Sequence, residues 1–217
     1  MSGKKNIVIA DIRDKLPTHL SKKYLQRELK DIKKIILHCD DLDKTVYEIA
    51  EWDLQPNPIS STGCPSITYS YFIEKDGKAY YSSDVRNITW HVGNHNKESL
   101  AICLQYKATG NPNPPPVVQL EAAYDVITRL CLWLGVEPTS IFGHRELKGT
   151  GWFYDRNGKV KYRKSCPGWK IDLDKDLRYN VTIRCQEALN KFGAKLVVDG
   201  VWGSKSSKAF KKFKKGH

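Results

Sequence analysis

Residues that could bind a metal ion are spread widely along the 217-residue chain: His38, His91, His95, His144 and Cys166. Hydrolytic zinc sites use three protein ligands and leave a fourth position for water. His38 and His144 each follow a short apolar run that predicts a strand, and side chains at strand ends can project into a shared cleft. Cys166 precedes Pro167-Gly168, which stiffens the loop and suits a fixed ligand. Ligands this far apart define no motif, so a zinc centre and unconnected polar residues beside a buried thiol both remain open.

The elements that must position these residues alternate between strands and helices. Apolar runs predict strands over residues 35–37, 99–105 and 141–142, and residues 69–81 predict a hairpin that turns at Asp76-Gly77. Two helices are expected, one over 46–54 after a capping box from Thr45 to Glu48, and one over 118–134 that ends at Gly135. A further hairpin, with a turn at Asn157-Gly158, lies between His144 and Cys166. This order predicts a mixed α/β domain.

The positive charge is concentrated at the C-terminal end. The chain has 36 basic and 24 acidic side chains, a net charge of +12. Residues 178–217 hold 10 basic and 2 acidic side chains, which is +8, and their pattern changes to helix, loop and helix. We therefore expect two domains, 1–177 and a small all-α module over 178–217. The lysines favour a polyanion such as nucleic acid, an anionic membrane face or a phosphate-bearing cell wall, although a solvated helix face is the simpler alternative.

Composition excludes several classes of protein. A hydrophobic share of 40% and a charged share of 28% argue against a disordered chain, and no apolar stretch approaches the length of a membrane span. The charged leader Met1–Lys5 is followed by further charged residues, so no signal peptide is predicted and we expect a cytoplasmic product. Six scattered cysteines are expected to be reduced thiols.

Several stretches together resemble the zinc-dependent N-acetylmuramoyl-L-alanine amidases, relatives of the peptidoglycan recognition proteins, and especially phage endolysins of that group. They lie in the family's order over about residues 33–170: IILHCD, YSYFIEKDGKAYY, WHVGN, ESLAICL, GHRE and KSCPG. The resemblance implies a mixed central β-sheet flanked by helices, with a substrate groove along one face.

The resemblance also implies roles for individual residues. His38, His144 and Cys166 become the ligands of one Zn²⁺ per chain. Tyr69 falls on the family's catalytic tyrosine, and Lys164 falls on the lysine that phage enzymes place beside the reacting carbonyl. Without the family, Tyr69 would be interpreted as a half-buried strand residue and Lys164 as a solvated loop residue.

The remaining candidate site residues are expected to bind substrate. His91, together with Trp90 and Asn94, lies in the segment that the resemblance places in the cleft, whereas His95 receives no role. The long segment between the ligands His144 and Cys166 departs from the family. Its aromatic hairpin, which includes Trp152, is predicted to form one wall of the groove and to touch glycan or stem peptide. A second departure is the missing acidic residue on the strand before the cleft, where Cys103 stands instead, so that proton handling would rest on Tyr69.

The C-terminal stretch resembles part of a helical peptidoglycan-binding module, in the sequence CQEALNKFGAKLVVDGVWGSKSSKAFKKF. The function implied is hydrolysis of the amide between N-acetylmuramic acid and L-alanine, by a bacteriolytic phage or prophage endolysin. Such an enzyme accumulates in the host cytoplasm and acts on the cell wall after release, with peptidoglycan and anionic wall polymers as partners. A non-catalytic peptidoglycan recognition protein is the alternative, and such members typically lack the cysteine ligand. A nucleic-acid or polymerase-binding protein is less favoured, since no nucleic-acid motif is present.

Overall fold

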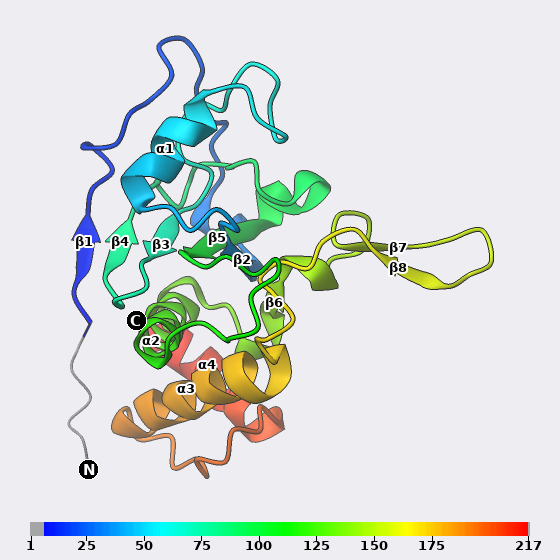
Figure 1. Ribbon diagram of the computed structural model, residues 1–217. Helices are drawn as coiled ribbons and strands as arrows, with labels where there is room; N and C mark the ends of the chain where they lie inside the picture. The colour runs from blue at the N-terminus through cyan, green and yellow to red at the C-terminus, as the bar shows by residue number, and fades with distance from the viewer. Residues whose placement is uncertain (1–6, 217) are drawn as a thin grey trace.

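A computed structural model describes residues 7–216 and contains one mixed six-stranded sheet (Figure 1). The strand order is β1-β4-β3-β5-β2-β6, in which β3 and β4 pair antiparallel and the other neighbours pair parallel. The strands are β1 Ile9–Asp11, β2 Lys34–Cys39, β3 Tyr71–Ile73, β4 Ala79–Tyr81, β5 Ser99–Leu104 and β6 Ile141–Gly143. Residues 1–6, which include the charged leader Met1–Lys5, and residue 217 lie outside the described residues. The first residues of the predicted domain 1–177 and the last residue of the predicted module 178–217 are therefore not described.

The two longest strands, β2 and β5, are covered on both faces. Every residue of β5 is buried, and in β2 only Lys34 is partly exposed. Continuous apolar runs of this kind are typical of parallel strands in the middle of an α/β layer structure. His38 lies near the end of β2, opposite Cys103 of β5, so a polar side chain emerges where the apolar run stops.

Helices cover the two faces of the sheet (Figure 1). Helix α2, Val117–Leu134, packs its apolar side against Ile35, Leu37 and their neighbours, and it ends at Gly135, whose φ of 70° is left-handed. Helix α1, Val46–Leu54, covers Phe72 and Cys103 on the opposite face. Its first turn is closed by the reciprocal bonds of the Thr45–Glu48 capping box. The groove described below opens on the α1 face.

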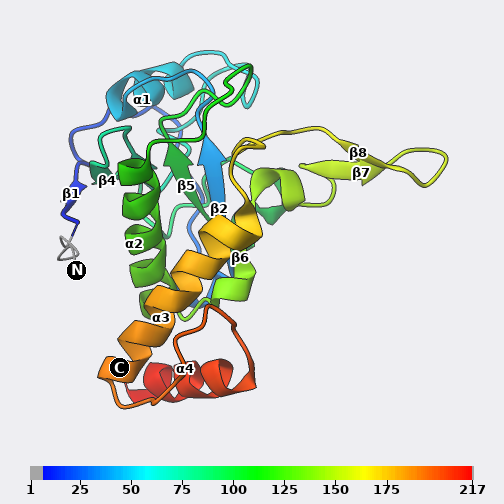
Figure 2. The same ribbon diagram turned by 60° about the horizontal axis from the view of Figure 1, so that its bottom comes forward.

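A two-stranded hairpin projects from the body of the molecule (Figure 2). Its strands are β7 Trp152–Tyr154 and β8 Val160–Tyr162, joined by the turn at Asn157-Gly158. Short helical turns connect the remaining elements: η1 Leu29–Asp31, η2 Gly93–Glu98, η3 Pro138–Ser140 and η4 His144–Glu146. The base of the hairpin follows η4 directly, which brings it beside His144.

The C-terminal segment is helical, and its first helix packs on α2. The π-helical turn η5, Leu173–Arg178, continues directly into α3, Tyr179–Lys191, and a loop leads to α4, Ser204–Gly216. Leu177, Val181 and Cys185 belong to the same buried cluster as the inner face of α2. Helix α4 lies across the end of α3 (Figure 2) and buries Phe210 against Trp202. The predicted boundary at Arg178 therefore falls within continuous helix, and the division into two domains remains a prediction.

The predicted fold class is confirmed, and the predicted strands, hairpins and helices are present within one or two residues of their expected positions. The first helix of the C-terminal segment was expected over residues 182–192, and α3 begins three residues earlier. Among residues 7–216, no helix combines the length and the apolar character of a membrane span.

Truncation tests how independent the C-terminal segment is. A chain that ends at Leu177 loses α3, and with it the burial of Val181, Cys185 and Leu189. Burying such a side chain stabilises a fold by about 1.5–3 kcal/mol, so the loss is on the order of 5 kcal/mol, which is comparable to a typical total stability. We expect this fragment to be unfolded or to melt far below the full chain, whereas a chain ending at Gly203 retains a cooperative transition. Equal melting temperatures for the 1–177 fragment and the full chain, measured by circular dichroism, would instead support a domain boundary there.

Candidate metal centre

The three predicted metal ligands, His38, His144 and Cys166, converge at one point. One potential ligand atom of each lies within 4.8 Å of those of the other two. His38 comes from the end of β2, His144 begins η4 just after β6, and Cys166 lies in the loop that follows β8. Because β2 and β6 are neighbouring parallel strands, their carboxyl ends bring the two histidines to the same edge of the sheet.

The donor set fits a divalent metal ion such as zinc. The Cys166 Sγ atom lies 3.6 Å from His38 Nδ1, and the ring centroids of His38 and His144 are 5.0 Å apart. Burial, with Lys164 as a second cause, lowers the pKa of His144 to about 4. Burial also holds the pKa of His38 well below its usual range. Both imidazoles are therefore neutral near pH 7, which is the form that binds metal.

A chain of hydrogen bonds fixes the orientation of His38. Its Nε2 lies 3.0 Å from His91 Nδ1, and His91 Nε2 lies 3.3 Å from the Ser99 hydroxyl, which donates to the backbone carbonyl of His95 over 2.6 Å. A carbonyl can only accept, so the Ser99 oxygen must accept from His91 Nε2–H. His91 Nδ1 then accepts from His38 Nε2–H. This sequence of donors leaves the lone pair of His38 Nδ1 directed toward Cys166, where a metal would bind.

His91 is a buried member of this chain as well as part of the groove wall. Burial, followed by the charge of Arg27, lowers its pKa to about 3, so it remains a neutral acceptor. The structure thus places His91 against a metal ligand. Its predicted contact with substrate is not tested by this placement.

Cys166 is held by backbone and arginine contacts. Its Sγ accepts a bond from the backbone N–H of Cys39 at 3.3 Å, and its carbonyl accepts from the N–H of Arg145 at 2.9 Å. The Arg145 guanidinium is buried and donates to the carbonyls of Gly168 and Ile171, which fixes the loop after the cysteine. Arg145, which directly follows the ligand His144, therefore positions the third ligand, Cys166.

His144 is held from both sides. Glu146 accepts from the backbone N–H of Gly143 and pairs with Arg178, which ties η4 to the start of α3. On the other side, a Cβ atom at Gly151 would lie 2.1 Å from the His144 carbonyl oxygen. Only glycine permits this approach, so the base of the hairpin can rest directly on η4.

The three ligands lie in an open groove of about 850 Å³. The sequence-predicted residues Tyr69, Trp90, His91 and Lys164 also line it. Its walls come from the end of α1, the loop after it, the segment before η2 and the base of the hairpin. The further lining side chains include Asp40, Asp41, Trp52, Pro58, Ile59, Asn96, Thr150 and Arg163.

Tyr69 lies two residues before β3, with its ring centroid 5.5 Å from that of His38. Burial raises the pKa of this phenol well above its ordinary value, so Tyr69 is a neutral hydroxyl that can donate a hydrogen bond. The neighbouring Cys103 is fully buried, and burial likewise raises the pKa of its thiol. Lys164 is exposed at the groove, and its positive charge contributes to the low pKa values of both ligand histidines.

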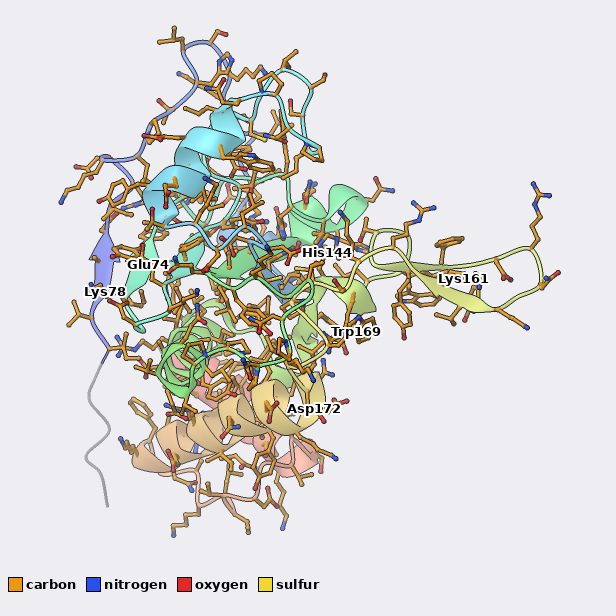
Figure 3. All side chains as sticks on the ribbon, viewed as in Figure 1. Glu74, Lys78, His144, Lys161, Trp169 and Asp172 are labelled. Carbon is orange, nitrogen blue, oxygen red and sulfur yellow. The ribbon has the colours of Figure 1, made fainter. Side chains whose placement is uncertain are left out.

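Three residues singled out by the sequence lie away from the groove lining. Asn94 is exposed on η2, and Trp152 lines a separate cavity with its indole N–H donating to the Glu146 carbonyl. His95 lies beside Glu98, and its Nε2 is near the Lys148 carbonyl. The strands of the hairpin project outward (Figure 3). Only residues at the base of the hairpin, such as Thr150 and Arg163, line the groove.

Sequence reasoning missed the polar residues that orient the ligands. Ser99 and Arg145 were recognised as parts of the stretches ESLAICL and GHRE, without roles of their own. Ser99 is the first residue of a strand, and nothing in its sequence position indicates a bond to a histidine eight residues earlier. The aliphatic loop residues Pro58 and Ile59 carry no chemical signal, so their position beside the metal centre emerges only from the fold.

The chain belongs to the N-acetylmuramoyl-L-alanine amidase family, whose model matches residues 28–169. That match spans all three predicted ligands and ends three residues after Cys166. A comparison with curated protein sequences gave no match.

Solved structures with the same fold include bacterial, phage and insect proteins. The N-acetylmuramoyl-L-alanine amidase LysC from Clostridium intestinale aligns with a TM-score of 0.53 and 15% identity over 84% of this chain and 97% of its own. The Ph2119 endolysin from a Thermus scotoductus bacteriophage aligns with 0.55 and 19% identity over 75% and 92%. Drosophila PGRP-LB aligns with 0.54 and 18% identity over 78% and 94%. At these identities the comparisons establish the fold.

Replacing Ser99 tests the hydrogen-bond chain behind His38. Ser99→Ala removes the acceptor for His91 Nε2–H, so the orientation of His38 is no longer fixed. Loss of such an outer partner typically costs about 10–100-fold in metal affinity, and we expect a zinc dissociation constant raised by that factor in competition with a chromophoric chelator. Ser206→Ala, a buried serine in α4, is the matched control and should leave the affinity unchanged. Wild-type affinity in Ser99→Ala would show that the chain does not orient the ligand.

Proposed function

We propose that the protein is a zinc-dependent amidase that hydrolyses the bond between N-acetylmuramic acid and L-alanine in bacterial peptidoglycan. The observation that carries the proposal is the convergence of His38, His144 and Cys166 in an open groove of a chain that belongs to this amidase family. Two neutral imidazoles and one sulfur provide three ligands of the type that catalytic zinc uses, one ion per chain. A closed structural site would need a fourth protein ligand, and the cluster found within residues 7–216 has three.

When bound, zinc supplies a Lewis acid that polarises a carbonyl and lowers the pKa of a water molecule to about 7. The protein's own residues then act on the substrate. Lys164, exposed at the groove, would donate to the oxygen of the scissile carbonyl and offset the negative charge that develops there. Loss of one such donor typically costs about 2.7–4 kcal/mol in the activation free energy.

Tyr69 is proposed to orient the attacking water and to hold a proton near the leaving nitrogen. Its hydroxyl is neutral over the working pH range, because burial keeps the pKa of the phenol high. Cys103, which stands where some relatives carry an acid, is buried, and burial raises the pKa of its thiol, so Cys103 offers no carboxylate-like base. Tyr69 therefore acts in this proposal as a neutral hydrogen-bond donor beside the ligands.

The groove walls suggest where the polymer lies. Trp90 offers a half-buried ring on one side, and Arg163 and Thr150 lie on the side formed by the hairpin base. We propose that stem peptide and glycan occupy this groove on either side of the metal centre. Asn94 lies outside the groove lining and would meet only the ends of a long substrate. In the cell, the enzyme would act as an endolysin that reaches the wall after release from the host cytoplasm, a proposal supported by the endolysins among the structures of the same fold.

Replacement of the sulfur ligand tests the proposed activity. Purified wild-type protein should release new amino termini of L-alanine from isolated walls, without new reducing sugar ends. Cys166→Ser is expected to lower that rate by at least 100-fold and to reduce bound zinc, since a hydroxyl is a poor zinc ligand. A chelator should abolish the activity, and added zinc should restore it. The proposal fails if wild-type protein releases reducing ends instead, or if Cys166→Ser cleaves walls at the wild-type rate.

Helix α4 is proposed to hold the enzyme on anionic wall polymers. All six of its lysines, between Lys205 and Lys215, are exposed, whereas Phe210 is buried on the inner side. Lys214 also lines a small hollow of about 280 Å³ together with Lys30, Lys33 and the acidic Glu137, which brings two further lysines beside the helix. Phosphate or carboxylate groups of wall polymers match this charge.

Neutralising one face of α4 tests this attachment. The triple variant Lys208→Gln, Lys211→Gln and Lys215→Gln should bind isolated walls several-fold more weakly at low ionic strength, with the difference vanishing at high salt because exposed charges are screened. The matched control carries Lys23→Gln, Lys97→Gln and Lys107→Gln, three exposed lysines outside α4 with the same total charge change. Co-sedimentation with walls is the measurement. Equal weakening in both variants would indicate a general charge effect without a role for α4.

A further inference from the structure

A second cavity, of about 560 Å³, lies beside the metal groove, and the groove and its proposed mechanism do not use it. It is bounded by the hairpin, by the loop after Cys166 and by η5. We call it the aromatic cleft, defined by the residues that line it: Arg145, Glu146, Trp152, Val160, Tyr162, Trp169, Ile171, Asp172, Leu173 and Asp174. In Figure 3, Trp169 and Asp172 both lie below His144, with Asp172 at the start of η5.

Three aromatic rings meet in the aromatic cleft in fixed orientations. Trp169 is 59% exposed and Tyr162 is 57% exposed, and their rings make an edge-to-face contact with centroids 5.1 Å apart. The indole N–H of Trp152 donates to the carbonyl of Glu146 over 2.9 Å. The Arg145 guanidinium lies 4.8 Å from the centroid of Trp169. Large exposed rings that gather at one hollow mark a binding surface, and here they are already oriented.

The polar groups of the aromatic cleft suit a neutral ligand that carries hydroxyl groups. Glu146 and Asp174 are both paired with Arg178, and the Arg145 guanidinium donates to two backbone carbonyls, so these charged groups already have partners within the protein. Asp172 accepts the N–H groups of Asp174 and Lys175 with Oδ1. Its Oδ2 accepts no hydrogen bond from residues 7–216 and can accept from a ligand hydroxyl.

We propose that the aromatic cleft is a binding site for the sugar residues of a β-linked N-acetylated glycan. The C–H faces of such sugars are apolar and stack on aromatic rings, while their hydroxyls need acceptors such as Asp172 at the edge of the ring. This inference rests on the proposed function, since it extends the surface offered to the same polymer. In this proposal, Trp152 contacts glycan in the aromatic cleft and not in the metal groove.

The position of the aromatic cleft relative to the metal centre supports this choice of ligand. Tyr162 precedes Lys164 by two residues, Trp169 follows Cys166 by three, and Arg145 is the neighbour of His144. The hairpin, the loop after Cys166 and η4 thus contribute residues to the aromatic cleft and also contain, or lie next to, residues of the metal groove. A polymer with its scissile amide at the metal centre can continue around the base of the hairpin into the aromatic cleft.

Binding of a peptide-free sugar tests the proposal directly. The probe is the β-1,4-linked tetramer of N-acetylglucosamine, which has no stem peptide and no scissile amide, titrated into the zinc-loaded full chain in a calorimeter. Wild-type protein should bind it, and Trp169→Ala and Tyr162→Ala should each weaken binding by about tenfold, as expected for removal of an aromatic anchor. Tyr162→Phe keeps the ring and should bind as wild type does. Trp133→Ala, a 56% exposed tryptophan of α2, is the matched control and should also bind as wild type does.

The possible outcomes separate this inference from the amidase proposal. The proposed glycan site is wrong if wild-type protein does not bind the tetramer, or if Tyr162→Ala binds it as well as wild type does. Either result holds even if walls are cleaved at the amide. Binding that depends on Tyr162 and Trp169 in a protein that cleaves no amide supports the aromatic cleft and contradicts the amidase. Thermal melting of each variant identifies any that fail to fold. If Trp169→Ala does not fold, Tyr162→Ala, which lies on the projecting hairpin, still tests the proposal.

Discussion

Two largely buried imidazoles must remain unprotonated beside a cysteine sulfur at an open groove, and the rest of the site is arranged around that requirement. Burial disfavours a charged imidazole, and the nearby Lys164 adds to this effect, so the pKa values of His38 and His144 lie below their usual range. A group kept neutral in this way offers a lone pair at pH 7 without competition from a proton. A bound cation would compensate the desolvation of three donor atoms at once, which accounts for a polar cluster at the end of an apolar strand.

The fold meets this requirement through a few polar connections to the backbone. His38 is oriented through His91 and Ser99 by a carbonyl that can only accept. Cys166 is positioned by Arg145, and η4 is tied to the last helices through the Glu146–Arg178 pair. Arg178 thus connects the metal centre to α3, which gives the C-terminal segment a structural role in the groove in addition to any contact with the wall.

The sequence was informative where local patterns determine structure. The apolar runs before His38 and His144 predicted two strands, the Thr45–Glu48 box predicted the start of α1, and Gly135 predicted the end of α2. The metal ligands followed from family resemblance, because residues 38, 144 and 166 are brought together only by the parallel pairing of β2 with β6 and by the loop clamped by Arg145. Long-range contacts of this kind leave no periodic signal in the chain. The position of Trp152 also depends on long-range contacts. Its ring was expected in the metal groove and lies instead in the aromatic cleft, because the contact of Gly151 with η4 sets where the hairpin leaves the body of the protein.

X-ray absorption at the zinc edge of the zinc-loaded full chain reports which atoms bind the metal. We expect one zinc per chain with two nitrogen scatterers near 2.0–2.1 Å, one sulfur near 2.3 Å and one further light atom from solvent, with the sulfur lost in Cys166→Ser. Zinc coordination without sulfur, or coordination that keeps its sulfur in that variant, would show that Cys166 is not a ligand.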